Sequence, residues 1–193
     1  MYPEFLSPIK GVLPISDQVF TQFSLRLKPL KVQKGQLLLS DGEICDKLWF
    51  VKAGLVRGYQ LTDDGFGNSI ESTEWFAKEH DFIYSADSFV NQVSARECIE
   101  ALECCTLIYI TRTDLYQLYA DHPEICCFGR IIAERSWLAH KELLRDMRLL
   151  SASQKLESFR QRSKDLFNRV PQKHIASYLG ISENYVSKLR AKR

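Results

Sequence analysis

The chain has 193 residues, 45% of them hydrophobic and 26% charged, which is the composition of a globular protein with one large domain or two smaller ones. No apolar run reaches the roughly 18–20 residues that a membrane-spanning helix needs. The N-terminal sequence MYPEFLSPIKG lacks the basic and apolar regions of a secretion signal. We therefore expect a cytoplasmic protein without membrane contact. The net charge of +2 is unevenly distributed, because residues 1–150 carry a net charge of −5 and residues 151–193 one of +7. This asymmetry favours a polyanionic partner for the C-terminal segment; the alternative is a solvated basic face without function.

The first part of the chain alternates short β-rich runs with glycine-containing turns. A helix is expected first, over residues 16–27, because apolar residues recur there at helical spacing behind a Ser16 or Asp17 cap. The strands expected after it cover residues 36–40, 47–53, 55–61 and 69–76, followed by a hairpin-like pair, 97–102 with 104–110. Short strands at even spacing, separated by glycines, predict an antiparallel barrel or jelly roll.

The pattern changes after Pro123, where apolar residues recur every three or four positions as far as residue 150. This spacing predicts one long helix, and a second apolar face of it is formed by Ile131, Trp137, Leu138 and Leu144. One face can cover the strands while the other meets a partner helix, so we expect a homodimer through residues 124–150. A helix that packs only on its own domain is the alternative.

The C-terminal sequence PQKHIASYLGISENYVSKLR predicts two short helices joined by a tight turn. Gly180 ends the first helix because glycine takes a positive φ without steric cost, and Ser182 caps the second. Ala176, Gly180 and Val186 have the spacing of a helix-turn-helix, in which the small residue lets the helices approach and the valine is held between them. An ordinary helical hairpin with a solvated polar face is the alternative.

The second helix of this motif is rich in side chains that can meet double-stranded DNA. The residues expected to contact base edges or phosphates are Ser182, Glu183, Asn184, Tyr185, Ser187, Lys188 and Arg190. Glu183, Asn184, Tyr185 and Lys188 are the candidate base readers among them, whereas Gln172 and Lys173 are placed for phosphates. Two subunits would present this helix to consecutive major grooves, so the DNA site should be a pseudo-palindrome with half-sites about one helical turn apart.

Two stretches, VPQKHIASYLGISENYVSKLR and KGQLLLSDGEICDKLWFVKAGLVRGY, give nearly the whole chain a resemblance to the Crp–Fnr-type transcriptional regulators. The resemblance implies an α+β fold: an antiparallel, cyclic-nucleotide-binding-like β-roll (double-stranded β-helix or jelly roll) in residues 1–122, a dimerisation helix in 123–150 and a small all-α helix-turn-helix domain in 151–193. It also implies DNA binding as a homodimer, and contact with RNA polymerase if the protein is an activator. The family's β-hairpin wing has no counterpart here, because residues 163–170 are expected to be helical instead.

The sequence departs from the family at the effector site. Members that bind cyclic AMP carry a Gly-Glu pair for the ribose and, further on, an Arg-Ser pair for the cyclic phosphate. The corresponding positions here hold Tyr84 with Ser85, and Ala95 with Arg96. We therefore expect either a small-molecule effector other than cyclic AMP or none, with Tyr84, Ser85, Arg96 and His140 as candidate contacts. The alternative for Arg96 is a surface or structural charge.

The remaining residues give no sign of catalysis. The six cysteines form neither a CxxC spacing nor a disulfide framework. Among the four histidines only His80 lies in the region of strands, where a cupin-type metalloenzyme would need a His/Glu cluster. Neither a Ser-His-Asp constellation nor a P-loop is apparent, so we expect no enzyme activity, no metal and no resident cofactor. A ligand-sensing β-roll that acts through protein partners is the remaining alternative.

Overall fold

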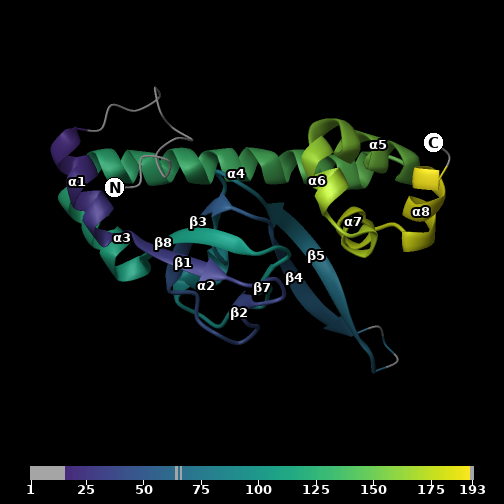
Figure 1. The fold of residues 1–193 in the computed structure, drawn as a ribbon, viewed down its shortest axis with the longest axis horizontal. Helices are drawn as coiled ribbons and strands as arrows, with labels where there is room; N and C mark the ends of the chain where they lie inside the picture. The colour runs from purple at the N-terminus through teal and green to yellow at the C-terminus, as the bar shows by residue number, and fades with distance from the viewer. Residues whose placement is uncertain (1–15, 64, 66, 192–193) are drawn as a thin grey trace. The chain divides into compact units, whose positions relative to one another are not determined.

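The computed structural model describes residues 16–63, 65 and 67–191, and their side chains as far as residue 188. The chain forms two compact units, one from residues 1–58 with 76–135 and the other from residues 59–75 with 136–193. Helix α4 (Pro123–Leu149) runs through both, as do strands β4 (Val56–Asp63) and β5 (Ser69–Ala77) (Figure 1). None of the helices in the described residues is both long and apolar enough to cross a membrane.

The strands build the β-roll that the sequence predicts. Two four-stranded sheets have the orders β1-β8-β3-β6 and β2-β7-β4-β5. The first sheet is antiparallel throughout, and in the described part of the chain the sheets do not close into a barrel. The remaining strands are β1 (Lys28–Val32), β2 (Leu37–Leu39), β3 (Lys47–Ala53), β6 (Phe82–Ile83), β7 (Cys98–Ala101) and β8 (Cys105–Thr111).

The expected hairpin between residues 97–102 and 104–110 is wrong, although both segments contain strands. Strand β7 pairs with β2, where Leu37 lies opposite Glu100, whereas β8 belongs to the other sheet. Strand β8 is hydrogen-bonded to β1 on one edge and to β3 on the other. Because both of its edges are occupied, β8 has no free backbone groups for β7.

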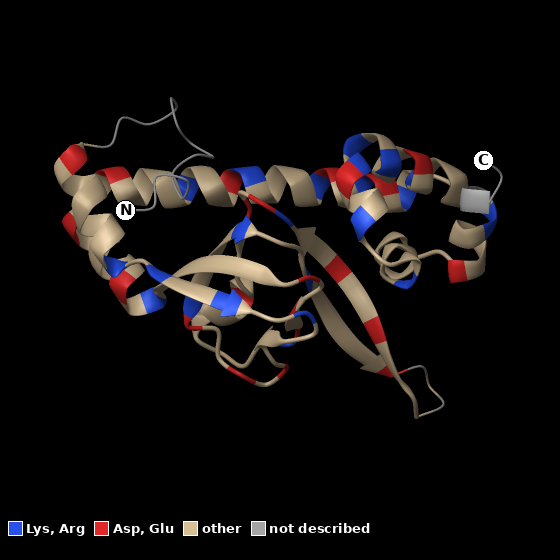
Figure 2. Cartoon of the chain, viewed as in Figure 1, with Lys and Arg blue, Asp and Glu red and all other residues tan. Residues whose placement is uncertain are grey.

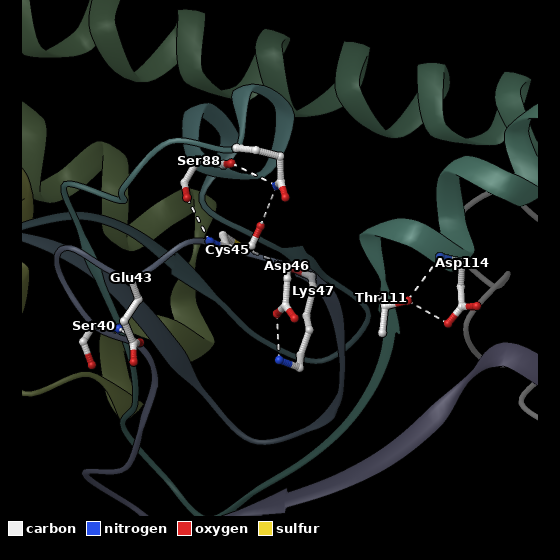
Figure 3. A network of polar contacts seen from close by, with 9 residues as sticks. Ser40, Glu43, Cys45, Asp46, Lys47, Ser88, Thr111 and Asp114 are labelled. Carbon is white, nitrogen blue, oxygen red and sulfur yellow. Dashed lines mark hydrogen bonds and ion pairs between the residues drawn. The ribbon is translucent and has the colours of Figure 1, made fainter.

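Helix α1 (Asp17–Arg26) confirms the predicted N-terminal helix, and Ser16 caps it by accepting the N–H of Val19 at 3.4 Å. Helices α2 (Ala86–Asn91) and α3 (Arg112–Asp121) were not expected from the sequence. At the start of α3, Thr111 Oγ1 accepts the N–H of Asp114 at 3.1 Å (Figure 3). This pair is a helix-start signal of the capping-box kind, and it is visible in the sequence TRTD.

The predicted long helix after Pro123 is confirmed as α4, which is 27 residues long. Its first turns are anchored in the first unit by Phe128, whose ring lies 6.0 Å from that of Phe23 and 5.5 Å from that of Phe82. Gly129 allows α3 to approach closely, because a Cβ atom there would lie only 2.2 Å from the hydroxyl of Tyr119. The base of α4 is therefore fixed by aromatic packing within the first unit.

The C-terminal part of the second unit is entirely helical in its described residues. Helices α5 (Ala152–Arg162), α6 (Lys164–Arg169), α7 (Gln172–Leu179) and α8 (Glu183–Ala191) follow α4. Helix α6 confirms the helix expected in place of a wing. The buried apolar side chains of these helices form a small core, made by Leu156, Phe159, Leu166, Phe167, Val170, Ile175, Ala176, Leu179 and Val186.

The outer part of the β4–β5 hairpin also belongs to the second unit and is hydrogen-bonded to α7. The hydroxyl of Ser177 accepts the backbone N–H of Thr73 at 2.9 Å and donates to the carbonyl of Glu71 at 3.0 Å. One serine of the first helix of the predicted helix-turn-helix is therefore joined to the backbone of β5.

Candidate nucleic-acid interface

The turn between α7 and α8 has the conformation that the sequence predicts. Gly180 is left-handed, with φ 62° and ψ 40°, and its N–H donates to the carbonyl of Ser177 at 3.1 Å. The N–H of Ile181 donates to the carbonyl of Ala176 at 3.0 Å, so the end of α7 is closed by backbone hydrogen bonds. Ser182 caps α8, because its hydroxyl accepts the N–H of Tyr185 at 3.3 Å.

Packing fixes the angle between the two helices. Ala176 is 3% exposed and Val186 is fully buried, as expected for the small residue and the held valine of a helix-turn-helix. Leu179 is also buried, and together these side chains close the space between α7 and α8. The polar face of α8 is consequently directed away from this core.

The candidate DNA contacts follow this division between faces. Ser182, Glu183, Asn184, Ser187 and Lys188 are exposed, and Tyr185 is half-buried. On α7, Lys173 is exposed and Gln172 is half-buried. Arg190 lies within α8, but its side chain is outside the described residues. Residues four positions apart are neighbours on the surface of a helix. On α8 this applies to Glu183 and Ser187, and to Asn184 and Lys188.

Charge is concentrated on the same helices. Residues 151–193 contain ten Lys and Arg residues against three Asp and Glu residues. Figure 2 shows basic positions along α5 to α8, whereas strand β5 carries Glu71 and Glu74. A positive surface around α8 would attract the phosphate backbone independently of base sequence.

A charged cluster that the sequence did not reveal joins α4 to α5. Asp146 is only 7% exposed, and its carboxylate is paired with Arg162 and accepts the hydroxyl of Ser158 at 3.2 Å. Arg145 lies 3.3 Å from the same carboxylate. Partial burial acts to raise the pKa of Asp146, but Arg162, Ser158 and Arg145 outweigh it and hold this pKa below its usual value. The cluster ties the end of α4 to the first helix of the C-terminal core.

The middle of α4 is exposed on all sides within the described chain. Every residue from 133 to 142 is exposed, and the large apolar side chains among them include Trp137 at 65% and Leu138 at 59%. Leu144 at 50% extends this surface toward the end of the helix. Several exposed large apolar side chains on one stretch of helix are typical of a surface that another helix covers.

The candidate effector residues lie in both units. In the first unit, Tyr84 is half-buried with its ring 5.3 Å from that of Phe89, Ser85 is buried and Arg96 is exposed. Burial raises the pKa of Tyr84, with smaller contributions from Tyr116 and Cys45. His140 is exposed on α4 in the second unit.

Side chains of α2 and the residue after it bind the backbone of the loop before β3. Ser88 Oγ accepts the N–H of Cys45 at 2.8 Å (Figure 3). The same hydroxyl donates to the carbonyl of Val93 at 2.6 Å. Gln92 is left-handed, with φ 55°, and its amide donates to the carbonyls of Cys45 at 3.3 Å and Phe89 at 3.0 Å. Ser88 and Gln92 are not recognisable from the sequence, because polar residues in an irregular segment carry no distinctive pattern.

A buried ion pair lies in the sheet that contains β4 and β7. Arg57 is 2% exposed, and its Nε and Nη2 atoms lie 2.8 and 2.6 Å from one oxygen of Glu100. The sequence signal for this pair is the arginine in LVRGY and the glutamate in CIEA, each the one charged residue among apolar neighbours and glycine. The guanidinium of Arg57 is therefore already neutralised by a side chain of the neighbouring strand.

Comparisons with known proteins agree with this architecture. Residues 29–122 match the family model for the cyclic nucleotide-binding domain. Among solved structures, FixK2 from Bradyrhizobium japonicum is similar with a TM-score of 0.74 at 14% identity, covering 86% of this chain and 83% of that one. A protein described as a Crp/Fnr-family transcriptional regulator from Eubacterium rectale gives a TM-score of 0.72 at 18% identity, covering 94% and 83%.

A third similar structure is that of the c-di-GMP-responsive global regulator CLP from Xanthomonas campestris, with a TM-score of 0.68 at 15% identity, covering 92% of this chain and 93% of that one. The comparison with curated proteins gives no match. At these identities the likeness establishes the fold, which is the one that the resemblance to the Crp–Fnr type implies.

Proposed function

We propose that this chain, which contains a cyclic nucleotide-binding domain and has the fold of the Crp–Fnr-type transcriptional regulators, is a sequence-specific DNA-binding regulator that acts as a homodimer. The observation that supports it most strongly is the α7–α8 pair. Ala176 and Val186 are buried between the helices, Gly180 is left-handed, and the polar residues of α8 are exposed. A rigid helix pair with an exposed polar face is what insertion into a major groove requires.

The side chains of α8 suggest how bases would be distinguished. Lysine can donate to the O6 and N7 atoms of guanine, asparagine can bind adenine through both of its amide atoms, and glutamate can accept from the amino group of cytosine. Lys188, Asn184 and Glu183 are the corresponding residues, and all three are exposed on α8. Lys173 and Gln172, at the start of α7, would hold phosphates and set the register of the helix on the duplex.

The exposed middle turns of α4 support dimerisation through this helix. Trp137, Leu138 and Leu144 expose large apolar surfaces that water would solvate poorly. A second copy of the helix is the simplest cover, because a two-fold axis along α4 brings identical apolar positions together. The same axis would place the two α8 helices for half-sites about one turn of DNA apart.

For the effector, we propose either a small molecule other than cyclic AMP, with Tyr84, Ser85 and Arg96 of the first unit as candidate contacts, or none. Cyclic-AMP-binding members of the family hold the ribose and phosphate with a glutamate and an arginine. Here those two positions hold Ser85 and Ala95, both buried, and the carbonyl of Ala95 accepts the N–H of Gly42 at 2.9 Å. Neither side chain can form the ion pair that binds a cyclic phosphate.

The test begins by selecting duplexes from a random DNA library with the full-length protein. Fluorescence anisotropy then compares a selected duplex with a scrambled one for wild-type protein, Lys188→Ala and Lys164→Ala. Lys164 is exposed on α6, so its removal changes net charge equally without touching α8. We expect Lys188→Ala to weaken mainly the selected duplex and Lys164→Ala to weaken both slightly. Failure of the wild-type protein to bind any duplex at low salt would overturn the proposal.

A further inference from the structure

The exposed side chains of α4 contain a heptad pattern with one titratable member. Ala133, Trp137, His140 and Leu144 are separated by four, three and four residues, and all four are exposed. Alternating steps of three and four are the a/d pattern of a two-stranded coiled coil. The parallel row through Leu138 instead includes Glu134, Lys141 and Arg145. The first row is therefore the better candidate for the line of contact, and it is called the α4 seam below.

We propose that His140 makes the dimer formed through the α4 seam sensitive to pH. This inference rests on the homodimer proposed above. In a two-fold dimer of parallel helices, each residue of the seam meets its own copy across the axis. Two neutral imidazoles can pack there between Trp137 and Leu144, whereas two imidazolium ions would place like charges together in an apolar setting.

The surroundings of His140 offer little to neutralise such a charge. The residues three and four positions away on α4 are Ser136, Trp137, Leu143 and Leu144, and none of them is acidic. The adjacent residue is Lys141, which would add to the repulsion. In the dimer the facing α4 helix would present the same residues, since both copies share one sequence.

The three acidic residues within six positions of His140 along α4 are engaged elsewhere. Asp146 is paired with Arg162 of α5. Glu134 lies 2.6 Å from Arg130 in an ion pair four positions apart. Glu142 lies 3.7 Å from Arg162 of α5. All three carboxylates face arginines outside the seam, so protonation of His140 would not be offset by a carboxylate.

The direction of the effect follows from the chemistry of imidazole. Histidine gains its positive charge as pH falls from about 8 to about 5, so the dimer is tight at pH 8 and loosens on acidification. Because both copies become charged, we expect the dissociation constant of the dimer to rise roughly tenfold or more between pH 8 and pH 5.5.

The experiment is sedimentation equilibrium of the full-length protein without DNA, at several pH values from 8 to 5.5. Circular dichroism at each pH limits the comparison to conditions in which the fold is intact. Wild-type protein is compared with His140→Gln, which removes the titrating group, and with His122→Gln, which removes a histidine at the end of α3, outside the seam. We expect wild type and His122→Gln to dissociate on acidification and His140→Gln to stay dimeric.

The outcomes separate this inference from the proposed function. A wild-type protein that is monomeric at every pH refutes the homodimer and, with it, the role of His140. A stable dimer whose dissociation constant does not change with pH refutes only the role of His140. Acid-dependent dissociation that persists in His140→Gln also refutes that role, because another group would then be responsible.

Discussion

Gly180→Ala is the substitution that most directly tests the turn between α7 and α8. Gly180 has φ 62°, a conformation in which an L-residue with a side chain is strained by roughly 1–2 kcal/mol. The added Cβ would lie 3.2 Å from the terminal methyl of Met147, a flexible tip that can shift. We therefore expect a loss of about 1–2 kcal/mol in the free energy of unfolding of the second unit, dominated by backbone strain.

Urea denaturation followed by circular dichroism measures this loss, at fixed protein concentration because dimerisation would shift the midpoint. Gly180→Asn is the matched control, since asparagine tolerates the left-handed conformation better than alanine does. DNA affinity at low temperature should change little, because the second unit stays mostly folded. The reasoning is refuted if Gly180→Ala unfolds at the wild-type midpoint. Equal destabilisation by Asn and Ala would show that contact with Met147, and not φ, is responsible.

Three further substitutions test the other parts of the account. Lys188→Ala should weaken binding to a cognate duplex by about 1–3 kcal/mol in anisotropy titrations, and equal weakening on all sequences would reduce Lys188 to a phosphate contact. Asp146→Asn should lower the thermal midpoint at pH 7. The folded-state pKa of Asp146 is lowered, so its stabilisation of the fold is present above the unfolded-state pKa and is lost as pH falls. The thermal midpoints of wild type and Asp146→Asn should therefore converge toward pH 3, and a difference that stays constant with pH would contradict this. Leu144→Asp should give a folded monomer by sedimentation, and a persistent dimer would exclude the α4 seam.

The elements that could be predicted from the sequence are those whose conformation is determined by residues close together in the sequence. The helix-turn-helix depends on Ala176, Gly180 and Val186, whose roles follow from size and backbone freedom within one short stretch. The long helix depends on apolar periodicity over many turns, which outweighs any single residue. Both predictions are confirmed by the positions of α4, α7 and α8.

Pairings between distant residues could not be predicted in the same way. A short connection that looks like a hairpin turn joins strand β7 to β8, but β7 pairs with β2, because β8 is already paired on both edges. The buried pair of Arg57 with Glu100 and the cluster of Asp146 with Arg162 join residues 43 and 16 positions apart. Such pairs depend on how the chain folds back, which local propensity does not specify.

Helix α3 was missed for a different reason. Thr111 and Asp114 form a recognisable helix start, but the apolar residues before them continue the strand pattern without a glycine or proline. The strand signal of β8 therefore masked the cap in the sequence.

The stoichiometry of DNA binding and its salt dependence test the central claim most directly. A duplex selected by the protein, carrying one pseudo-palindrome, is titrated in anisotropy and analytical ultracentrifugation between 50 and 200 mM salt. We expect two chains per duplex and an affinity that falls by roughly a thousandfold or more over this range, as phosphate contacts from two basic domains require. One chain per duplex without sequence preference, or no binding at 50 mM salt, would contradict the account.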